Sequence, residues 1–261
     1  MSEISAPVLR AEALSKSFGG LTVVHDVSFD VEDHGRVALI GPNGAGKTTI
    51  FNLISGVYHV DAGRIFVQDV DVTDVPSRKR IDFGVSRSFQ NIRLMQHLTV
   101  LENLYLGQHH VNAGFIDLLT PFRFRLRHRW QLEAMAALER AGLAEYTDAT
   151  IQELPYGVRK RVDLVRATLA RPRILMLDEP AAGLNPSEAD DLKADLLRLS
   201  SDGVGLLIVE HDMAFVRELC DHVIVLNFGE KIAEGSMADI RENELVREAY
   251  LGGDLEQRNA A

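Results

Sequence analysis

Hydrophobic residues follow two patterns along the chain, short unbroken runs and segments with a helical period, and their alternation predicts a fold of the α/β class. Three unbroken apolar runs, at 37–40, 174–177 and 205–209, have the length and composition of buried parallel strands. Each run stops at glycine or at acidic residues, and the ends of parallel strands are where such sheets place their ligands. Segments with a helical period lie between these runs, and we expect them to cover the sheet.

Shorter patterns predict the remaining elements. Early strands are expected at Val8–Leu14 and Val27–Val31, on either side of a turn at Gly19-Gly20. Helices are expected over Lys47–Ser55 and Trp130–Ala141, because each segment stops at a glycine. Further patterns predict strands at Arg64–Val67 and Val85–Phe89, a helix at Arg159–Ala170, a hairpin of His222–Asn227 with Lys231–Glu234, and helix caps at Thr99, Asn185 and Ser236.

The composition is ordinary for a globular protein, with 46% hydrophobic and 25% charged residues among 261. The formal net charge of −10 disfavours a nucleic-acid partner. A single cysteine, Cys220, excludes an intramolecular disulfide and indicates a reducing cytoplasm. The first ten residues lack the apolar core of a signal peptide, and no apolar run approaches the ~18 residues that span a bilayer. We therefore expect a membrane connection only through a partner.

One glycine-rich loop carries the strongest chemical signal. Its sequence GPNGAGKTT matches the phosphate-binding pattern G-x-x-x-x-G-K-[ST] at every fixed position. The glycines let backbone amides turn inward around an anion, and the following helix N-terminus adds partial positive charge. Lys47 can reach the β- and γ-phosphates, and the Thr48 hydroxyl can ligate Mg²⁺. The loop is the candidate site for a purine nucleoside triphosphate, formed by Gly41, Pro42, Asn43, Gly44, Ala45, Gly46, Lys47, Thr48 and Thr49.

Charged residues at the ends of the second and third apolar runs form another candidate cluster. Asp178 follows its strand directly and is suited to hold Mg²⁺, either directly or through water. The adjacent Glu179 is suited to orient and deprotonate an attacking water. His211 follows the third run, where it can hydrogen-bond a γ-phosphate and that water, or it is a turn histidine without a role. Parallel strands would bring all three to the sheet edge that holds Lys47.

Two further features allow more than one interpretation. Phe18 precedes the phosphate loop and could stack on adenine, although a core position is the more common place for phenylalanine. The basic stretch Arg123–Arg129 lies beside aromatic residues and could contact RNA or anionic lipid headgroups. In an acidic protein, a solvated helical face is the simpler interpretation of that stretch.

The order of these features resembles the ATP-binding-cassette (ABC) ATPases over essentially the whole chain. Gly41–Thr49 looks like the Walker A motif of that family, and Ile174–Glu179 looks like Walker B with its catalytic glutamate. The resemblance implies ATP and Mg²⁺ as cofactors. It also implies that Phe18 stacks on adenine, that Gln90 senses Mg²⁺ and the membrane partner, and that His211 is the switch histidine.

The family signature Leu-Ser-Gly-Gly-Gln, which contacts the ATP of a partner subunit, corresponds here to Leu-Pro-Tyr-Gly-Val. Leu154 and Gly157 match, whereas Pro155, Tyr156 and Val158 are departures. Proline offers neither a hydroxyl nor a backbone N–H to a phosphate. We therefore expect two unequal ATP sites, with the site on this chain carrying more of the hydrolysis. Related subunits share the Leu-x-Tyr-Gly form, so an adequate geometry of its own is the alternative.

The resemblance implies a P-loop NTPase (RecA-like) core with an antiparallel β subdomain and an inserted α-helical subdomain. We expect residues 1–90 to form the first part of the nucleotide-binding core together with the β subdomain. Residues 91–162 would form the helical signature subdomain, and 163–242 the second part of the core. Residues 243–261 would be a C-terminal helix and tail.

Several stretches narrow the resemblance to the ATPase subunits of branched-chain amino-acid importers, with urea and amide importers close by. They lie at 87–94, 154–157, 179–186 and 249–252. Such subunits are peripheral on the cytoplasmic face of the inner membrane. They work with a second ABC ATPase, as a heterodimer or a homodimer, with two transmembrane permease subunits, and indirectly with a periplasmic or extracellular solute-binding protein. The basic stretch would then face solvent near the membrane.

Two other functional classes remain as alternatives. A cassette ATPase acting on ribosomes or DNA usually carries two cassettes in one chain or a long coiled coil, and neither pattern is present. A non-hydrolysing nucleotide switch would need neither Glu179 nor His211.

Overall fold

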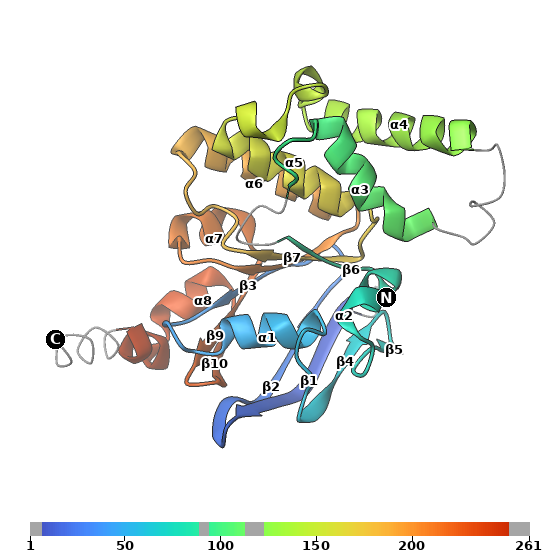
Figure 1. The fold of residues 1–261 in the computed structure, drawn as a ribbon. Coiled ribbons are helices and arrows are strands. Elements are labelled where there is room, and N and C mark those ends of the chain that lie inside the picture. The colour runs from blue at the N-terminus through green and yellow to red at the C-terminus, as the bar shows by residue number, and fades with distance from the viewer. Residues whose placement is uncertain (1–6, 89–93, 113–122, 251–261) are drawn as a thin grey trace, which may run out of the picture.

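A computed structural model describes residues 7–88, 94–112 and 123–250, of which 107–112 and 123–129 are described by their backbone alone. Across these residues, two β-sheets lie on either side of helix α1 (Lys47–Ile54), and further helices cover the outer face of the larger sheet (Figure 1). The fold is α/β, as the sequence predicts, and it combines an antiparallel sheet, a larger mixed sheet and a separate group of helices.

The smaller sheet is antiparallel and has the strand order β2-β1-β4-β5. Its first two strands extend further than predicted and meet at the Gly19-Gly20 turn, where both glycines have positive φ. The apolar pattern missed the end of β1 because the pairing is irregular there, with register shifts between Ala11 and Ser17. The strands are β1 (Leu9–Phe18), β2 (Leu21–Val31), β4 (Ala62–Val67) and β5 (Val70–Asp71).

The larger sheet has the order β10-β9-β3-β8-β7-β6 and is parallel from β9 to β6. The three apolar runs form its adjacent central strands, and their side chains are almost entirely buried. Because the carboxyl ends of these strands lie at one edge, the residues that follow them are neighbours. The strands are β3 (Arg36–Ile40), β6 (Val85–Ser88), β7 (Ile174–Asp178), β8 (Gly205–Val209), β9 (His222–Asn227) and β10 (Glu230–Gly235).

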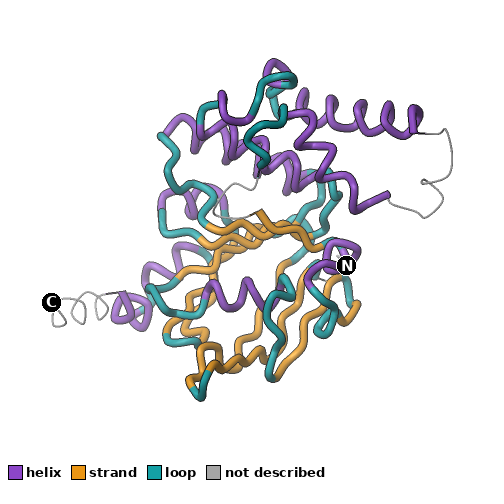
Figure 2. Tube along the Cα trace, in the orientation of Figure 1, coloured by secondary structure: helices purple, strands orange, loops and turns teal. Residues whose placement is uncertain are grey.

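Helix α1 lies between the two sheets (Figure 2) and completely buries Ile50, Phe51 and Leu53. This burial comes from both sheets, so the helix that follows the glycine loop is fixed in the main core. The opposite face of the larger sheet is covered by α6 (Pro186–Ser201), α7 (Met213–Leu219) and α8 (Met237–Glu242). Shorter segments are α2 (Ser77–Arg80) and the 3₁₀ turns Ile81–Phe83, Ala144–Tyr146 and Ile151–Glu153.

The helical lobe consists of α3 (Val100–Asn112), α4 (Arg123–Arg140) and α5 (Tyr156–Thr168), which share an apolar cluster of their own. Helix α4 begins at Arg123 rather than at the predicted Trp130, because alternating arginines concealed the apolar period. The predicted domain boundaries stay a prediction. All three predicted caps are present, as the pairs Thr99 with Glu102, Asn185 with Glu188, and Ser236 with Asp239.

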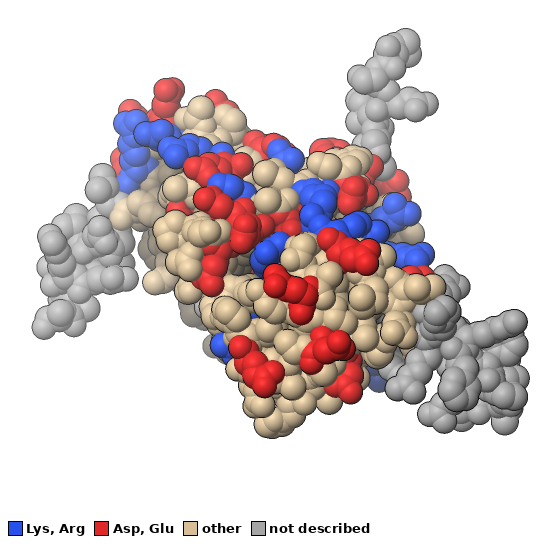
Figure 3. Space-filling view, turned by 90° about the horizontal axis from the view of Figure 1, so that it is seen from above, with Lys and Arg blue, Asp and Glu red and all other residues tan. Residues whose placement is uncertain are grey.

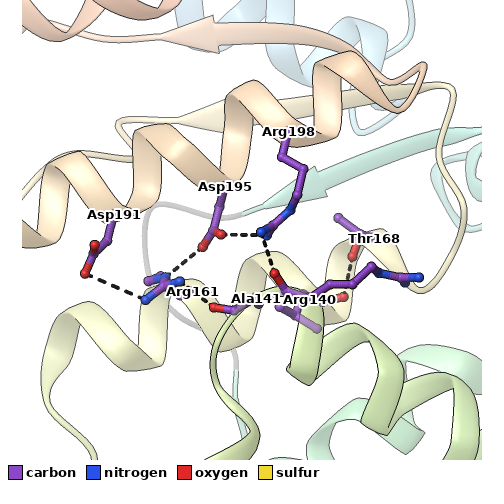
Figure 4. Close-up of polar contacts among 8 residues, drawn as sticks. Arg140, Ala141, Arg161, Thr168, Asp191, Asp195 and Arg198 are labelled. Atoms are coloured by element: carbon purple, nitrogen blue, oxygen red, sulfur yellow. Dashed lines mark hydrogen bonds and ion pairs between the residues drawn. The ribbon is translucent and has the colours of Figure 1, made fainter.

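A buried acid on α6, Asp195, joins the helical lobe to the core (Figure 4). Its carboxylate accepts hydrogen bonds from Arg161 Nε at 2.7 Å and from Arg198 Nη2 at 2.6 Å. The same two guanidinium groups donate to the carbonyls of Ala141 and Arg140 at the end of α4. One carboxylate therefore orders two arginines that hold α4 against α6.

Charges of both signs are interspersed on the face that carries the helical lobe, as the view from above shows (Figure 3). The side chains of Arg123–Arg129 lie outside the described part of the chain, so the orientation of that basic stretch stays a prediction. None of the described helices combines the length and the apolar character that a membrane crossing requires.

Candidate functional site

The phosphate loop connects β3 to α1 and adopts a conformation that its glycines permit. Gly41, Gly44 and Gly46 have φ of 148°, 82° and 99°, in the region that favours glycine. Space also excludes a side chain at Gly41, because an added Cβ would lie 2.2 Å from the carbonyl oxygen of Leu226 in β9. The loop therefore packs against the sheet and ends at the N-terminus of α1, where an anion is stabilised. Pro42 and Thr49 are half-buried and Ala45 is buried, whereas Asn43 and Thr48 are exposed.

Lys47 is 7% exposed and turns back onto its own loop. Its Nζ donates to the carbonyl oxygens of Gly41 at 2.7 Å and Pro42 at 2.9 Å. Burial lowers the pKa of Lys47, and the nearby carboxylates of Glu179 and Asp178 act in the opposite direction. The ammonium group thus lies between the phosphate loop and the acids that follow β7.

Asp178, the last residue of β7, pairs with Arg87 of the adjacent strand β6. Arg87 Nη2 lies 3.2 Å from Asp178 Oδ2, and both side chains are largely buried. Nη1 of the same guanidinium donates to Asn52 Oδ1 on α1 at 2.7 Å. This arrangement fixes Asp178 beside the helix that carries Thr48.

Glu179 leaves β7 in a left-handed conformation, with φ of 48°. Such a conformation costs a residue other than glycine about 1–2 kcal/mol, so the surrounding contacts must hold it. The Glu179 amide donates to the Val209 carbonyl oxygen at 2.8 Å. Its Oε1 lies 3.2 Å from Nε2 of His211, which follows β8. The strained turn therefore directs the carboxylate toward the histidine.

The sheet edge thus brings together four of the residues selected from the sequence: Lys47, Asp178, Glu179 and His211. Gln90, which the sequence places near them, lies outside the described residues.

Phe18 ends β1 and is 42% exposed, so the alternative of a core aromatic is wrong. Its ring meets that of Tyr58 edge to face, with centroids 5.2 Å apart. A Cβ added at Gly46 would lie 2.9 Å from the carbonyl oxygen of Val23 in β2. The β1–β2 hairpin that carries Phe18 therefore borders the phosphate loop.

The signature segment differs from its prediction. Leu154 is buried and Pro155 is the N-cap residue of α5, so Tyr156, Gly157 and Val158 form the first turn of that helix. The prediction of a loop before Arg159 was wrong because the extended Pro155 is followed directly by helical backbone, which a tyrosine and one glycine do not interrupt. The first amides of a helix have no partner within it, so this end still offers donors to an anion.

The sequence covering the phosphate loop, the acids of β7 and the signature helix matches a known family model. The model for ABC transporters matches residues 24–182, which is more than half of the chain. The chain belongs to the ABC transporter family. A second model, described as a branched-chain amino acid ATP-binding cassette transporter, matches residues 230–256.

Named relatives of this ABC protein align over nearly its whole length. The high-affinity branched-chain amino acid transport ATP-binding protein BraF of Pseudomonas aeruginosa is 44% identical, over 95% of this chain and 99% of BraF. LivG of Escherichia coli, with the same description, is 40% identical over 95% and 99%. The lipopolysaccharide export system ATP-binding protein LptB of Haemophilus influenzae is 33% identical over 94% and 97%.

Solved structures of ABC cassettes agree with the fold. A nucleotide-free cassette superposes with a TM-score of 0.81, and a cassette in its ADP conformation with 0.83. Both are 31% identical to this chain. The first covers 94% of this chain and 99% of its own length, and the second 95% and 99%. The chain is thus an ABC ATPase, which binds and hydrolyses ATP.

Sequence reasoning gave no role to three residues at this site: Arg87, which pairs with Asp178, and Lys160 and Glu210, which bond to the backbone of the segment after Glu179. Glu210 directly follows an apolar run of the sequence, as Asp178 does, so its position carried the same signal. Lys160 lies between Arg159 and Arg161, a pattern typical of a solvated face, yet it is 9% exposed. Nothing in the sequence pattern marked that lysine as buried.

Proposed function

We propose that this ABC ATPase powers an importer of branched-chain amino acids, or of a related small polar solute such as urea or an amide. The observation that carries the proposal is the 44% identity to a branched-chain amino acid transport protein over 95% of the chain. The C-terminal match at 230–256 supports it. Similarity to a lipopolysaccharide export protein is nearly as long but lower in identity. Membership of the ABC family alone therefore does not identify the transported solute.

The phosphate loop would surround the β- and γ-phosphates of ATP, with the Lys47 ammonium against them. Phe18, exposed at the border of that loop, would stack on the adenine. Binding would require Lys47 to exchange the Gly41 and Pro42 carbonyls for phosphate oxygens. Because the lysine is already buried, its charge would act on the phosphates through little intervening water.

The described residues fit a Mg²⁺ ion. Asp178 and Thr48 supply a carboxylate and a hydroxyl oxygen, and oxygen donors are what Mg²⁺ prefers. No group of three His, Cys, Asp or Glu side chains encloses a metal site in the described residues. That finding suits an ion held mainly by nucleotide oxygens and water, with Gln90 as the remaining proposed protein ligand. When bound, Mg²⁺ would neutralise charge on the phosphates.

Hydrolysis would depend on Glu179 and His211. The Glu179 carboxylate would accept a proton from the attacking water, a role typically worth ~10²–10⁴ in rate. His211, whose Nε2 lies 3.2 Å from that carboxylate, would hold the water and the γ-phosphate in line. Lys47 would stabilise the negative charge that the phosphate oxygens carry in the transition state.

A complete site would require a second ABC ATPase, identical to this chain or different from it. The signature segment Leu154–Val158 would close over ATP bound to that partner, and the partner's signature over ATP held by Lys47. Closure and reopening would pass through the helical lobe to two transmembrane permease subunits, and indirectly affect a periplasmic or extracellular solute-binding protein. The chain would work as a peripheral subunit on the cytoplasmic face of the inner membrane.

The test is to co-express the chain with candidate permeases, a second ATPase and a solute-binding protein from the same genome, and to reconstitute the purified complex in proteoliposomes. ATP-dependent accumulation of labelled leucine, isoleucine or valine is expected, with labelled urea as the related-solute arm and glutamate as the negative control. Copurification with ribosomes in place of permeases would contradict the proposal. Absence of ATP-dependent uptake of every solute tested would contradict it as well.

A further inference from the structure

Lys160 on α5 is a buried lysine whose ammonium group is bound by backbone carbonyls. Its Nζ donates to the carbonyl oxygens of Pro180 at 2.7 Å, Ala182 at 2.6 Å and Glu179 at 3.4 Å. An ammonium group has three donors, and these carbonyls can accept all three. Burial lowers the pKa of Lys160, while the charges of Glu210 and Glu179 act in the opposite direction. The lysine therefore binds the chain segment that directly follows the Walker B strand.

Glu210 holds the same segment through a backbone amide. It is 4% exposed, and its Oε1 accepts a hydrogen bond from the Ala181 amide at 2.7 Å. Its Oε2 accepts from the amides of His211 at 2.8 Å and Asp212 at 3.3 Å. The carbonyls of residues 179, 180 and 182 thus face a buried cation, and the amide of residue 181 faces a buried anion. This segment includes Glu179, whose left-handed backbone needs such support.

The first turn of α5 touches the same region through two further contacts. A Cβ added at Gly183 would lie 3.2 Å from Cε1 of Tyr156, so the tyrosine ring lies against that glycine. The Lys160 Nζ is 5.3 Å from the centroid of the same ring. A Cβ added at Gly157 would lie 2.5 Å from the Glu188 carboxylate on α6. The signature helix is therefore closely packed on the segment after Glu179 in its own chain.

We propose that Lys160 is a positioning residue for Glu179. It acts through the backbone of residues 179–182 and does not touch the nucleotide. Lys160 lies one helical turn after Tyr156, in the helix whose first turn, Tyr156–Val158, is assigned to the partner's ATP. Its hydrogen bond to the Pro180 carbonyl therefore links that first turn to the segment that carries Glu179 in its own chain. The inference rests on the proposed catalytic role of Glu179. Movement of the signature helix on closure would then change the position of the Glu179 carboxylate.

The test compares Lys160→Met, Lys160→Gln and Lys193→Met in the reconstituted transporter. Methionine keeps the length and removes charge and donors; glutamine keeps two N–H donors without the charge. Lys193 on α6 pairs with the exposed carboxylates of Asp190 and Glu218 and is the matched control. Lys160→Met is expected to lower kcat for ATP about 10- to 100-fold, because small misplacement of a reacting group has effects of that size.

The KM for ATP and the nucleotide Kd of the full chain are expected to stay within about twofold, since Lys47 and its loop are untouched. Lys160→Gln should be intermediate, and Lys193→Met unchanged. If Lys160→Met does not fold, the glutamine variant provides the same comparison. A rise in Kd as large as the loss in kcat would overturn the proposal, because it would indicate a general structural defect. Normal kcat in both Lys160 variants would overturn it too.

A double variant separates this inference from the proposed function. If Lys160 acts through Glu179, adding Lys160→Met to Glu179→Gln should lower the residual turnover no further. A full additional loss in the double variant would show that Lys160 acts elsewhere. Wild-type turnover by Glu179→Gln alone would instead refute the catalytic assignment of Glu179, and with it the basis of the inference.

Discussion

The imidazole Nε2 of His211 lies 3.2 Å from Oε1 of Glu179, and the two residues follow neighbouring parallel strands, β8 and β7. A histidine and a carboxylate this close are in direct contact, because a water lying between them would hold the two atoms further apart. The attacking water that we propose for Glu179 would therefore require the imidazole to move away from the carboxylate. The pair is therefore the part of the site that we expect to respond most to substitution.

Replacing Glu179 by glutamine should preserve ATP binding and remove most turnover at this site. The amide keeps the shape of the side chain but cannot accept the proton, and loss of a general base is typically worth ~10²–10⁴ in rate. Phosphate release by the reconstituted transporter measures the effect, with nucleotide titration as the control for binding. Hydrolysis at the normal rate would show that another residue is the base.

Replacing Lys47 by alanine should weaken nucleotide binding itself. The substitution removes the buried cation that we propose to contact the phosphates, and a charged hydrogen bond contributes about 1.5–3 kcal/mol, or about 10- to 100-fold in Kd. Titration of a fluorescent ATP analogue measures it directly. Lys79→Ala, at an exposed position on α2, is the control for loss of one positive charge.

The isolated chain should be a poor ATPase and largely monomeric in dilute solution. The proposed site is completed by the signature of a second subunit, and this chain's own signature is packed against its own α6. Light scattering gives the mass, and phosphate release gives the rate in the same sample. Vigorous turnover by verified monomer would contradict the composite site.

The two ATP sites of the assembled transporter should contribute unequally. Pro155 supplies neither a hydroxyl nor an N–H to the partner's ATP, and the Glu188 carboxylate lies beside Gly157 at the same helix end. A negative charge there opposes a phosphate, so the weaker site should be the partner's.

The corresponding measurement is to substitute the catalytic glutamate of each ATPase separately in the full complex. Glu179→Gln is expected to cause the larger loss of ATP turnover. If the partner's substitution abolishes turnover while Glu179→Gln leaves most of it, the asymmetry is assigned the wrong way round.

Asp195→Ala should destabilise the junction between the helical lobe and the core. Removing one partner of a buried ion pair costs about 3–5 kcal/mol, because the remaining charges are left without compensation. Asp191→Ala is the matched control, since Asp191 pairs with the same Arg161 at 3.7 Å but is 61% exposed; a change below about 1 kcal/mol is expected there. Urea unfolding followed by circular dichroism measures both. Equal effects would mean that the Asp195 pair contributes no more than a surface pair.

The sequence by itself determined the parts of this protein whose physics is local. The three apolar runs predict buried strands or helix segments. The glycine loop before Lys47 predicts a site where the backbone closely approaches a bound anion. The caps at Asn185 and Ser236 were equally readable, because a cap hydrogen bond joins residues three positions apart. These features specified the parallel sheet, its ligand edge and the acids placed there.

Tertiary structure alone decided which polar residues are buried and what they bind. Lys160 has the sequence surroundings of a surface lysine, and it binds backbone carbonyls because the segment that follows β7 meets α5 in space. Arg87 reaches Asp178 across two strands whose sequences lie far apart. The first turn of α5 likewise packs against Gly183 and Glu188, which lie far from it in the sequence. A periodic pattern reports which face of an element is apolar, but it carries no information about the partner across a contact.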